Sequence, residues 1–270
     1  MATAKWLGTA SLELVHDGKA LLIDPHLSRL SKWRSFTRPI EPDRAAIDAY
    51  LKTLTAEPVG IVVTHAHSDH LQDAPYLAQK LGVPVWGNES VDTLLKMHGL
   101  PGCPQVLAGG ERIAIGPFVI EPVKTRHGLV ALGHVPFPGR IDPHQQPPLW
   151  VWKYRHGEPP LLLFVECGGK SLFHMGTANL IDNLLPVRAV DAAWICLSGA
   201  NRTPQFAERL LQRLRPRRLY PFHFEDFSLP LSNETAYIPG CDPFRFADDL
   251  RRLSPGLETA VPRPYEAIPL

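Results

Sequence analysis

The sequence has no apolar run long enough to cross a membrane. Its longest uninterrupted apolar stretches, such as residues 161–165, are far shorter than the roughly 20 residues that span a bilayer as a helix. Residues 1–6 contain no apolar core of a secretory signal peptide. We therefore expect a cytoplasmic protein that does not bind a membrane.

An excess of charge of one sign is also lacking. The chain has 28 Lys and Arg against 27 Asp and Glu, which gives a formal net charge of +1. A nearly neutral chain has no general electrostatic attraction for nucleic acid. The arginine-rich residues 213–218 are better explained as a solvated helix end that leads into a strand. We expect no nucleic-acid partner.

Cysteine is scarce and scattered. Cys103, Cys167, Cys196 and Cys241 lie far apart and form no C-x-x-C pair. This spacing is typical of reduced thiols in a cytosolic protein.

Apolar residues make up 44% of 270 residues, which is enough for one large α/β domain or two small ones.

Four side chains that can bind a metal ion lie within residues 65–70. His65, His67, Asp69 and His70 follow the apolar run of residues 60–63 and precede an expected helix. Imidazole nitrogens and carboxylate oxygens are ligands for zinc and similar metals. In an extended segment His65 and His67 point the same way, and Asp69 and His70 can face a second position. The segment predicts half of a two-metal site at a strand end, although a histidine-rich surface turn is the alternative.

Two further polar residues stand at the ends of expected strands. His127 follows the strand of residues 119–125 and precedes a glycine, which is a suitable context for another ligand or for an ordinary loop histidine. Asp24 ends the strand of residues 20–23, where it is either a site residue or a turn-forming Asp before Pro25.

The order of expected elements is two successive sets of strands with crossing helices. This order fits one domain, residues 1–270, with two sheets packed together and helices outside. Residues 149–154 are an expected strand. Residues 129–148 form a long proline-rich loop that is either a substrate lid, with His134, Phe137, Arg140 and His144 as lining candidates, or a surface excursion. Helices are expected at residues 43–54, 71–80, 90–98, 179–185, 204–214 and 243–253.

The pattern His65-x-His67-x-Asp69-His70 resembles the signature of the metallo-β-lactamase fold superfamily. Residues 6–11 and 21–25 resemble the first hairpin of its ascorbate-6-phosphate lactonase-like branch. The resemblance implies an α/β fold, a four-layer αβ/βα sandwich of two mixed β-sheets with helices on the outer faces. It also implies zinc as cofactor, one or two ions, with manganese or iron as other options. The implied ligands are His65, His67 and His127 for the first ion, and Asp69, His70 and His223 for the second.

One segment departs from the family pattern. The family has a Gly-Asp-Thr segment whose Asp bridges both metals, whereas this chain has Gly176-Thr177 and no carboxylate in either register. We expect the second site to bind its ion weakly or to stay empty. His174 is a possible substitute ligand or a core histidine, and Glu166 and Asp24 are weaker candidates.

These observations predict a metal-dependent hydrolase. The resemblance implies a metal-bound hydroxide that attacks a small ester, lactone or phosphoester, with Asp69 as a ligand that also orients the nucleophile. The sequence does not identify a general acid; its candidates are His174, His134 and Glu225, and Arg34 or Arg140 could hold an anionic substrate. The alternative is a non-hydrolytic metal-binding protein, a ligand sensor or biosynthetic accessory. The oligomeric state is left open.

Overall fold

The computed structural model describes residues 2–270, and its first β-sheet has six strands. The strand order is β13-β1-β2-β3-β4-β5. β1, β2 and β3 pair antiparallel, and β4 and β5 add in parallel, so the sheet is mixed. Asp17 and Gly18 have positive φ angles in the turn between β2 and β3, as an Asp-Gly hairpin turn requires. The bounds are β1 Thr3–Gly8, β2 Ser11–His16, β3 Lys19–Ile23, β4 Glu57–Val62, β5 Val85–Trp86 and β13 Ala267–Pro269.

The second sheet has seven strands and is also mixed. Its order is β12-β11-β10-β9-β8-β7-β6. β6 to β9 pair antiparallel, and β9 to β12 pair in parallel. The bounds are β6 Ile113–Ile115, β7 Phe118–Lys124, β8 Leu161–Cys167, β9 Lys170–Met175, β10 Arg188–Cys196, β11 Leu214–Phe222 and β12 Glu258–Thr259.

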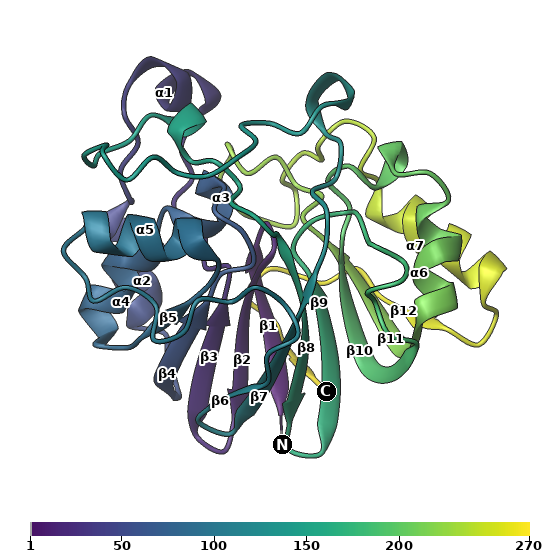
Figure 1. The fold of residues 1–270 in the computed structure, drawn as a ribbon. Coiled ribbons are helices and arrows are strands. Elements are labelled where there is room, and N and C mark those ends of the chain that lie inside the picture. Colours follow the sequence, from purple (N-terminus) through teal and green to yellow (C-terminus); the bar gives the residue numbers. More distant parts are fainter. Residues whose placement is uncertain (1) are drawn as a thin grey trace.

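The two sheets pack face to face, and helices cover both outer faces (Figure 1). α2, α4 and α5 lie outside the first sheet, whereas α6 and α7 lie outside the second. This arrangement confirms the predicted sandwich. Within residues 2–270, no helix is long and apolar enough to span a membrane. The bounds are α1 Lys32–Thr37, α2 Arg44–Leu51, α3 Ser68–Leu71, α4 Ala74–Leu81, α5 Glu89–Met97, α6 Phe206–Arg213 and α7 Pro243–Leu253, with 3-10 turns η1 Ala131–Gly133, η2 Val151–Lys153 and η3 Ala200–Arg202.

The central strands are apolar on both faces because each face is covered. In β3, Leu21 and Ile23 belong to the core between the sheets, whereas Leu22 belongs to the core under the helices. β4 shows the same alternation, with Val62 in the first core and Ile61 in the second. Side chains of a strand alternate between its faces, so both cores are built from one continuous apolar run.

Two local predictions are wrong, and a third is correct only in part. The helix expected at residues 71–80 is divided into α3 and α4, and Pro75, which has no N–H to donate, stands in the first turn of α4. The strand expected at residues 149–154 is the 3-10 turn η2, which follows two prolines. The helix expected at residues 179–185 is a series of turns, and there the Asn179 side chain accepts the N–H of Leu180.

Candidate metal centre

The predicted metal ligands lie at one edge of the sandwich, where strands from both sheets end. Residues 64–70 follow β4 and lead into α3. His127 follows β7, and His223 directly follows β11. Parallel strands present their carboxyl ends at the same edge of a sheet, so segments far apart in sequence meet there.

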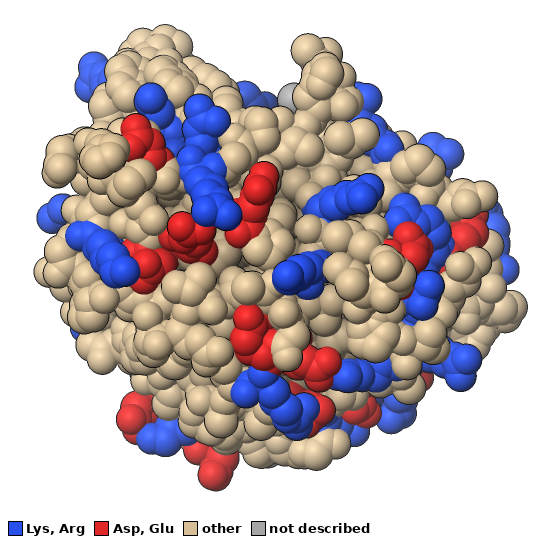
Figure 2. Space-filling view, in the orientation of Figure 1, with Lys and Arg blue, Asp and Glu red and all other residues tan. Residues whose placement is uncertain are grey.

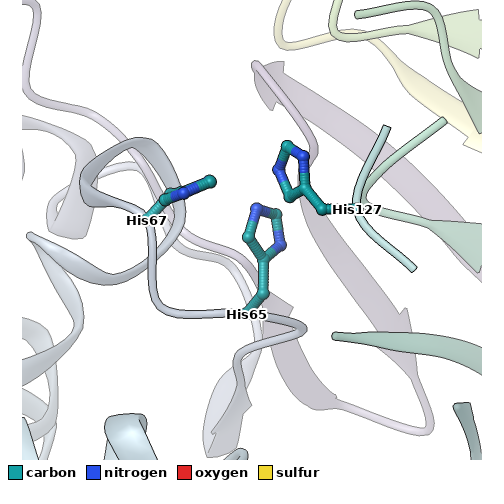
Figure 3. Close-up of side chains that lie close together, drawn as sticks. All are labelled: His65, His67 and His127. Atoms are coloured by element: carbon teal, nitrogen blue, oxygen red, sulfur yellow. The ribbon is translucent and has the colours of Figure 1, made fainter. Parts of the chain in front are cut away.

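The first group contains three histidines from two segments. Figure 3 shows His65 and His67, from one loop, converging with His127 from another. One nitrogen from each ring lies within 4.8 Å of the others. His67 Nε2 lies 2.8 Å from the Pro136 carbonyl oxygen, and His127 Nδ1 lies 2.7 Å from the Gly128 carbonyl oxygen. Each of these bonds leaves the opposite ring nitrogen available.

His65 supplies the observation that tests whether a metal ion fits. Its Nε2 is buried and has no hydrogen-bond partner among the described residues. A buried polar atom without a partner is costly, and a metal ion would satisfy it. Three imidazoles with one free nitrogen each match the donor set of a zinc site with one open position.

The second group is Asp69, His70 and His223, whose donor atoms also lie within 4.8 Å of one another. His223 Nε2 is 3.2 Å from Asp69 Oδ2, and His70 Nε2 is 3.7 Å from the same oxygen. The other nitrogen of His70, Nδ1, is 2.8 Å from Asp24 Oδ2. Asp24 therefore orients His70 from behind and leaves its Nε2 directed toward Asp69.

Burial sets the protonation of the first group. It lowers the pKa of His67 to about 4 and lowers the pKa of His65 and of His127 well below the usual value. All three rings are therefore neutral near pH 7, which is the form that binds a metal.

In the second group, charged neighbours act on the pKa values together with burial. Burial alone would raise the pKa of Asp69, but His70 and His223 hold it well below its usual value. Burial would lower the pKa of His70, yet the Asp24 and Asp69 carboxylates outweigh burial and raise it. Asp69 is thus the one anionic donor among the six side chains.

Both groups form part of the wall of a cavity of about 520 Å³. Its wall is mostly apolar away from the histidines, and α1, residues 130–137 and residues 198–202 contribute to it. Such a cavity is large enough for a small organic molecule. The apolar part of the wall is Leu30, Phe36, Ile40, Val130, Pro136, Phe137, Val151, Phe227, Ile238 and Pro239.

Comparison with known families identifies the fold. The family described as Beta-lactamase superfamily domain matches residues 19–224, which include every metal-ligand candidate. The chain belongs to the β-lactamase superfamily. This result confirms the predicted superfamily, while the narrower ascorbate-6-phosphate lactonase-like branch stays a prediction.

Several relatives of the superfamily carry a coarse functional name. A UPF0173 metal-dependent hydrolase from Cupriavidus taiwanensis is 27% identical over 236 residues, 83% of this chain and 74% of the relative. Another, from Thermus thermophilus, is 27% identical over 232 residues, 84% of this chain and 85% of the relative.

Solved structures share the superfamily fold at low identity. Igni18, a metallo hydrolase from Ignicoccus hospitalis, has a TM-score of 0.62 and 17% identity, covering 99% of this chain and 97% of the other. CmlA, a diiron β-hydroxylase from Streptomyces venezuelae, has a TM-score of 0.65 and 14% identity, covering 100% of this chain and 54% of the other.

The segment that departs from the superfamily pattern is buried beside the second group. A Cβ atom at Gly176 would lie 2.8 Å from Asp24 Oδ2 and closer still to Thr64 Oγ1, so no side chain fits there. Thr177 is buried, and its Oγ1 accepts the Gly128 N–H at 2.9 Å. Neither position supplies a carboxylate to the site.

Asp24 and Glu166, the weaker candidates to replace that carboxylate, are bound to other residues. Asp24 Oδ1 accepts the Thr64 N–H at 2.6 Å, and Asp24 Oδ2 binds Thr64 Oγ1 and His70 Nδ1. Glu166 lies on the far part of β8, where it pairs with Arg112 at 2.7 Å. Asp24 is thus a residue that positions His70.

His174 does not line the cavity. It is fully buried in β9, and its Nε2 lies 2.7 Å from the Ala10 carbonyl oxygen. Burial lowers its pKa. This environment is that of a core histidine, so the structure offers no support for His174 as a general acid or ligand.

Most of the other sequence candidates lie away from the cavity. Arg34 donates to the Pro39 carbonyl oxygen, and Arg140 pairs with Glu89 at 2.6 Å. Glu225 is buried against Arg29 and the Thr9 N–H. His134 and His144 are exposed and are not part of the cavity wall, whereas Phe137 is.

Sequence reasoning missed two histidines near the site. His26 forms part of the cavity wall, and burial lowers its pKa to about 3. His156 is buried, with its ring centroid 5.8 Å from that of His67 and 5.9 Å from that of His127. The position of His26 directly after Asp24-Pro25 was a usable signal, but His156 lies in a loop with no motif.

Proposed function

We propose that this chain is a zinc-dependent hydrolase that acts on a small ester, lactone or phosphoester. The observation that carries the proposal is the meeting of three neutral histidines, with the unpartnered His65 Nε2 among them, in the wall of a cavity. The metal-dependent hydrolases among the relatives support the same reaction class.

In this proposal each group of the site has a defined role. His65, His67 and His127 would hold the metal ion, and backbone carbonyls orient His67 and His127. A bound dication acts as a Lewis acid and makes a nucleophilic water available near neutral pH. The Asp69 carboxylate would accept a hydrogen bond from such a water and so orient it. The apolar cavity wall limits access of bulk water to the reacting atoms.

We further propose that the first group fills before the second. Its three imidazoles are neutral and need no proton loss to bind an ion, and two of them are held by backbone carbonyls. Two dications side by side would have only the Asp69 carboxylate to offset their repulsion. The second ion is therefore bound more weakly.

Metal content and turnover test this function together. Protein purified without chelator is analysed for metal, then assayed on a panel of esters, lactones and phosphoesters with and without zinc. We expect at least one ion per chain and zinc-dependent turnover. His65→Ala should abolish both, whereas His144→Ala, at an exposed histidine outside the cavity, should change neither. A reconstituted protein that binds no metal would refute the proposal.

A non-hydrolytic metal-binding protein is the second candidate. The observation that favours it is the absence of a carboxylate at Gly176 and Thr177. The fold also hosts other chemistry, as the diiron β-hydroxylase illustrates. Stoichiometric metal binding with no turnover across the whole panel would favour this candidate.

We propose a small-molecule substrate and a reducing, cytoplasmic compartment. The four cysteines are unpaired. Basic and acidic side chains are interspersed over the face shown in Figure 2, which does not favour a nucleic-acid partner. Equal migration of a labelled oligonucleotide with and without the protein in a gel-shift assay is the expected result.

A further inference from the structure

Arg202 is the feature of the cavity that the metal chemistry leaves unexplained. Four side chains of the cavity wall carry a formal charge: Lys32, Asp69, Arg202 and Asp226. Lys32 pairs with Asp226 at 2.5 Å, and Asp69 contacts His223 at 3.2 Å. Among residues 2–270, no carboxylate forms an ion pair with Arg202.

The backbone places Arg202 beside the segment that follows His127 of the first metal group. Residues 198–202 pack against the segment that follows His127, since a Cβ atom at Gly199 would lie 2.8 Å from the Leu129 carbonyl oxygen. A Cβ atom at Gly133 would lie 3.8 Å from Arg202 Nη1. Arg202 is exposed, and its guanidinium lies beside Gly133; Arg202 itself and Val130 of the neighbouring segment form part of the cavity wall.

The charge of the cavity favours an anion. The four formal charges of its wall cancel, so any bound metal ion leaves the cavity positive. Ser198 and Asn201 stand next to Arg202 in the wall and add hydrogen-bonding groups. A guanidinium presents two parallel N–H donors that match the geometry of a carboxylate or a phosphate.

The rest of the cavity wall favours a ligand that also has an apolar portion. Phe36, Phe137, Val151 and Ile238 form part of it, and they offer no charge to a substrate. A ligand that satisfies both parts has an apolar portion and one anionic group.

We propose that Arg202 binds the carboxylate or phosphate group of the substrate, so that the site selects small, mostly apolar substrates with one negative charge. This inference rests on the proposed function, because it takes the cavity as the substrate site. Arg202 is a binding residue in this proposal, and the hydrolytic chemistry stays with the metal centre.

Binding measurements test the proposal without requiring turnover. Benzoate, phenylphosphonate and neutral benzamide are titrated calorimetrically into zinc-loaded wild type, Arg202→Ala, Arg202→Gln and Arg245→Ala, the last an exposed arginine of α7 outside the cavity. We expect Arg202→Ala and Arg202→Gln to weaken binding of one or both anions by about five- to tenfold and to leave benzamide unchanged. Arg245→Ala should match wild type.

The two anions separate the possible ligand chemistries. Selective loss for phenylphosphonate assigns a phosphate group, and selective loss for benzoate assigns a carboxylate. Equal anion affinity in wild type and both Arg202 variants would overturn the proposal, because the metal alone would then hold the anion. Equal wild-type affinity for benzamide and the anions would overturn it too.

Kinetics on a matched pair of esters distinguish this inference from the proposed function. 4-Nitrophenyl acetate is neutral, whereas 4-nitrophenyl hydrogen succinate carries one carboxylate at neutral pH. Arg202→Ala should raise KM for the succinate ester alone, with kcat little changed. No turnover of these esters or of the lactones and phosphoesters of the panel, combined with Arg202-dependent anion binding, would refute the hydrolase and leave the anion site standing.

Discussion

Each histidine of the first metal group has one ring nitrogen that another group already engages. Pro136 and Gly128 carbonyl oxygens bind His67 and His127, and Thr64 Oγ1 lies 3.1 Å from His65 Nδ1. Such bonds fix both the ring orientation and the tautomer, and their loss typically lowers metal affinity. At the residue scale, therefore, the neighbours of the ligands determine how well the site is organised before an ion binds.

The first prediction concerns the missing carboxylate at Thr177. Thr177→Asp places an anion beside Gly128, which follows His127, and keeps an acceptor for the Gly128 N–H. We expect the second metal ion to bind at least about tenfold more tightly, because a second carboxylate offsets the repulsion between the ions. Titration against a competing chelator measures this change.

Thr177→Asn is the matched control for that substitution. It has nearly the same size and the same acceptor but no charge, so it should leave the second affinity close to that of wild type. If the Asn and Asp variants bind the second ion equally, charge at this position does not limit metal occupancy.

At the scale of elements, the site is built where strands end in tight turns. Asp24 follows β3 with φ 46°, and His223 follows β11 with φ 54°. Positive φ is uncommon for residues other than glycine and is found at functional sites that hold the chain in place. The turns aim both side chains back toward the end of β4 and toward α3, where Thr64, Asp69 and His70 lie.

The second prediction concerns the turn after β3. Asp24→Asn keeps the size of the side chain, and Asn tolerates positive φ. It removes the charge that binds His70 and the Thr64 N–H. We expect the free energy of unfolding to fall by about 2 kcal/mol and metal affinity to fall roughly 10- to 100-fold. Urea unfolding and chelator competition measure the two effects.

Asp17→Asn serves as the control for Asp24→Asn. Asp17 also has positive φ, at 49°, but lies in the exposed turn between β2 and β3. It should change neither stability nor metal affinity. Equal effects of the two substitutions would show that backbone geometry, not the charge of Asp24, decides the outcome.

At the scale of the molecule, each metal group draws donors from both halves of the sandwich. His65 and His67 extend from the first sheet, and His127 extends from the second. In the second group, Asp69 and His70 follow β4 of the first sheet, and His223 follows β11 of the second. A bound ion therefore links the two halves at their shared edge.

The third prediction follows from that link. An ion that binds only the folded chain stabilises it, by about 4 kcal/mol at a thousandfold excess over Kd. We expect chelation to lower the melting temperature and zinc to restore it, as calorimetry would show. His127→Ala should remove most of this response, whereas the exposed His134→Ala should keep it. A melting temperature that is independent of zinc would contradict the link.

The fourth prediction concerns the pH dependence of the metal-free protein. Burial lowers the pKa of His26 to about 3 and of His67 to about 4, against about 6.5 in an unfolded chain. Between these values the unfolded chain binds protons that the folded chain does not, so stability falls as pH drops below about 6.5. His70 has a raised pKa and opposes this trend.

Urea unfolding of chelated protein at pH 8 and pH 5 tests this expectation. The free energy of unfolding should be lower at pH 5, and His26→Gln should reduce the difference because Gln takes up no proton. A larger stability at pH 5 than at pH 8 would contradict the sign of the argument.

Much of the fold could be predicted because the signals are local. The apolar residues 60–63 followed by His65, His67, Asp69 and His70 identified a buried strand and the site that follows it. α7 has the predicted bounds, because Asp242 caps a helix whose apolar residues recur with helical spacing. The errors at residues 149–154 and 179–185 arose where prolines and side-chain bonds to the backbone override weak patterns.

The sequence by itself determined which metal-binding side chains the site contains and which alternating residues of the strands bury the faces of the two sheets. These depend on residue identity and spacing, which are fixed along the chain. Only the tertiary structure decided that Asp24 holds His70, that His174 is buried against Ala10, and that Arg202 forms part of the cavity wall with no ion-pair partner among residues 2–270. Such contacts join residues far apart in sequence, and the packing of the two halves brings them together.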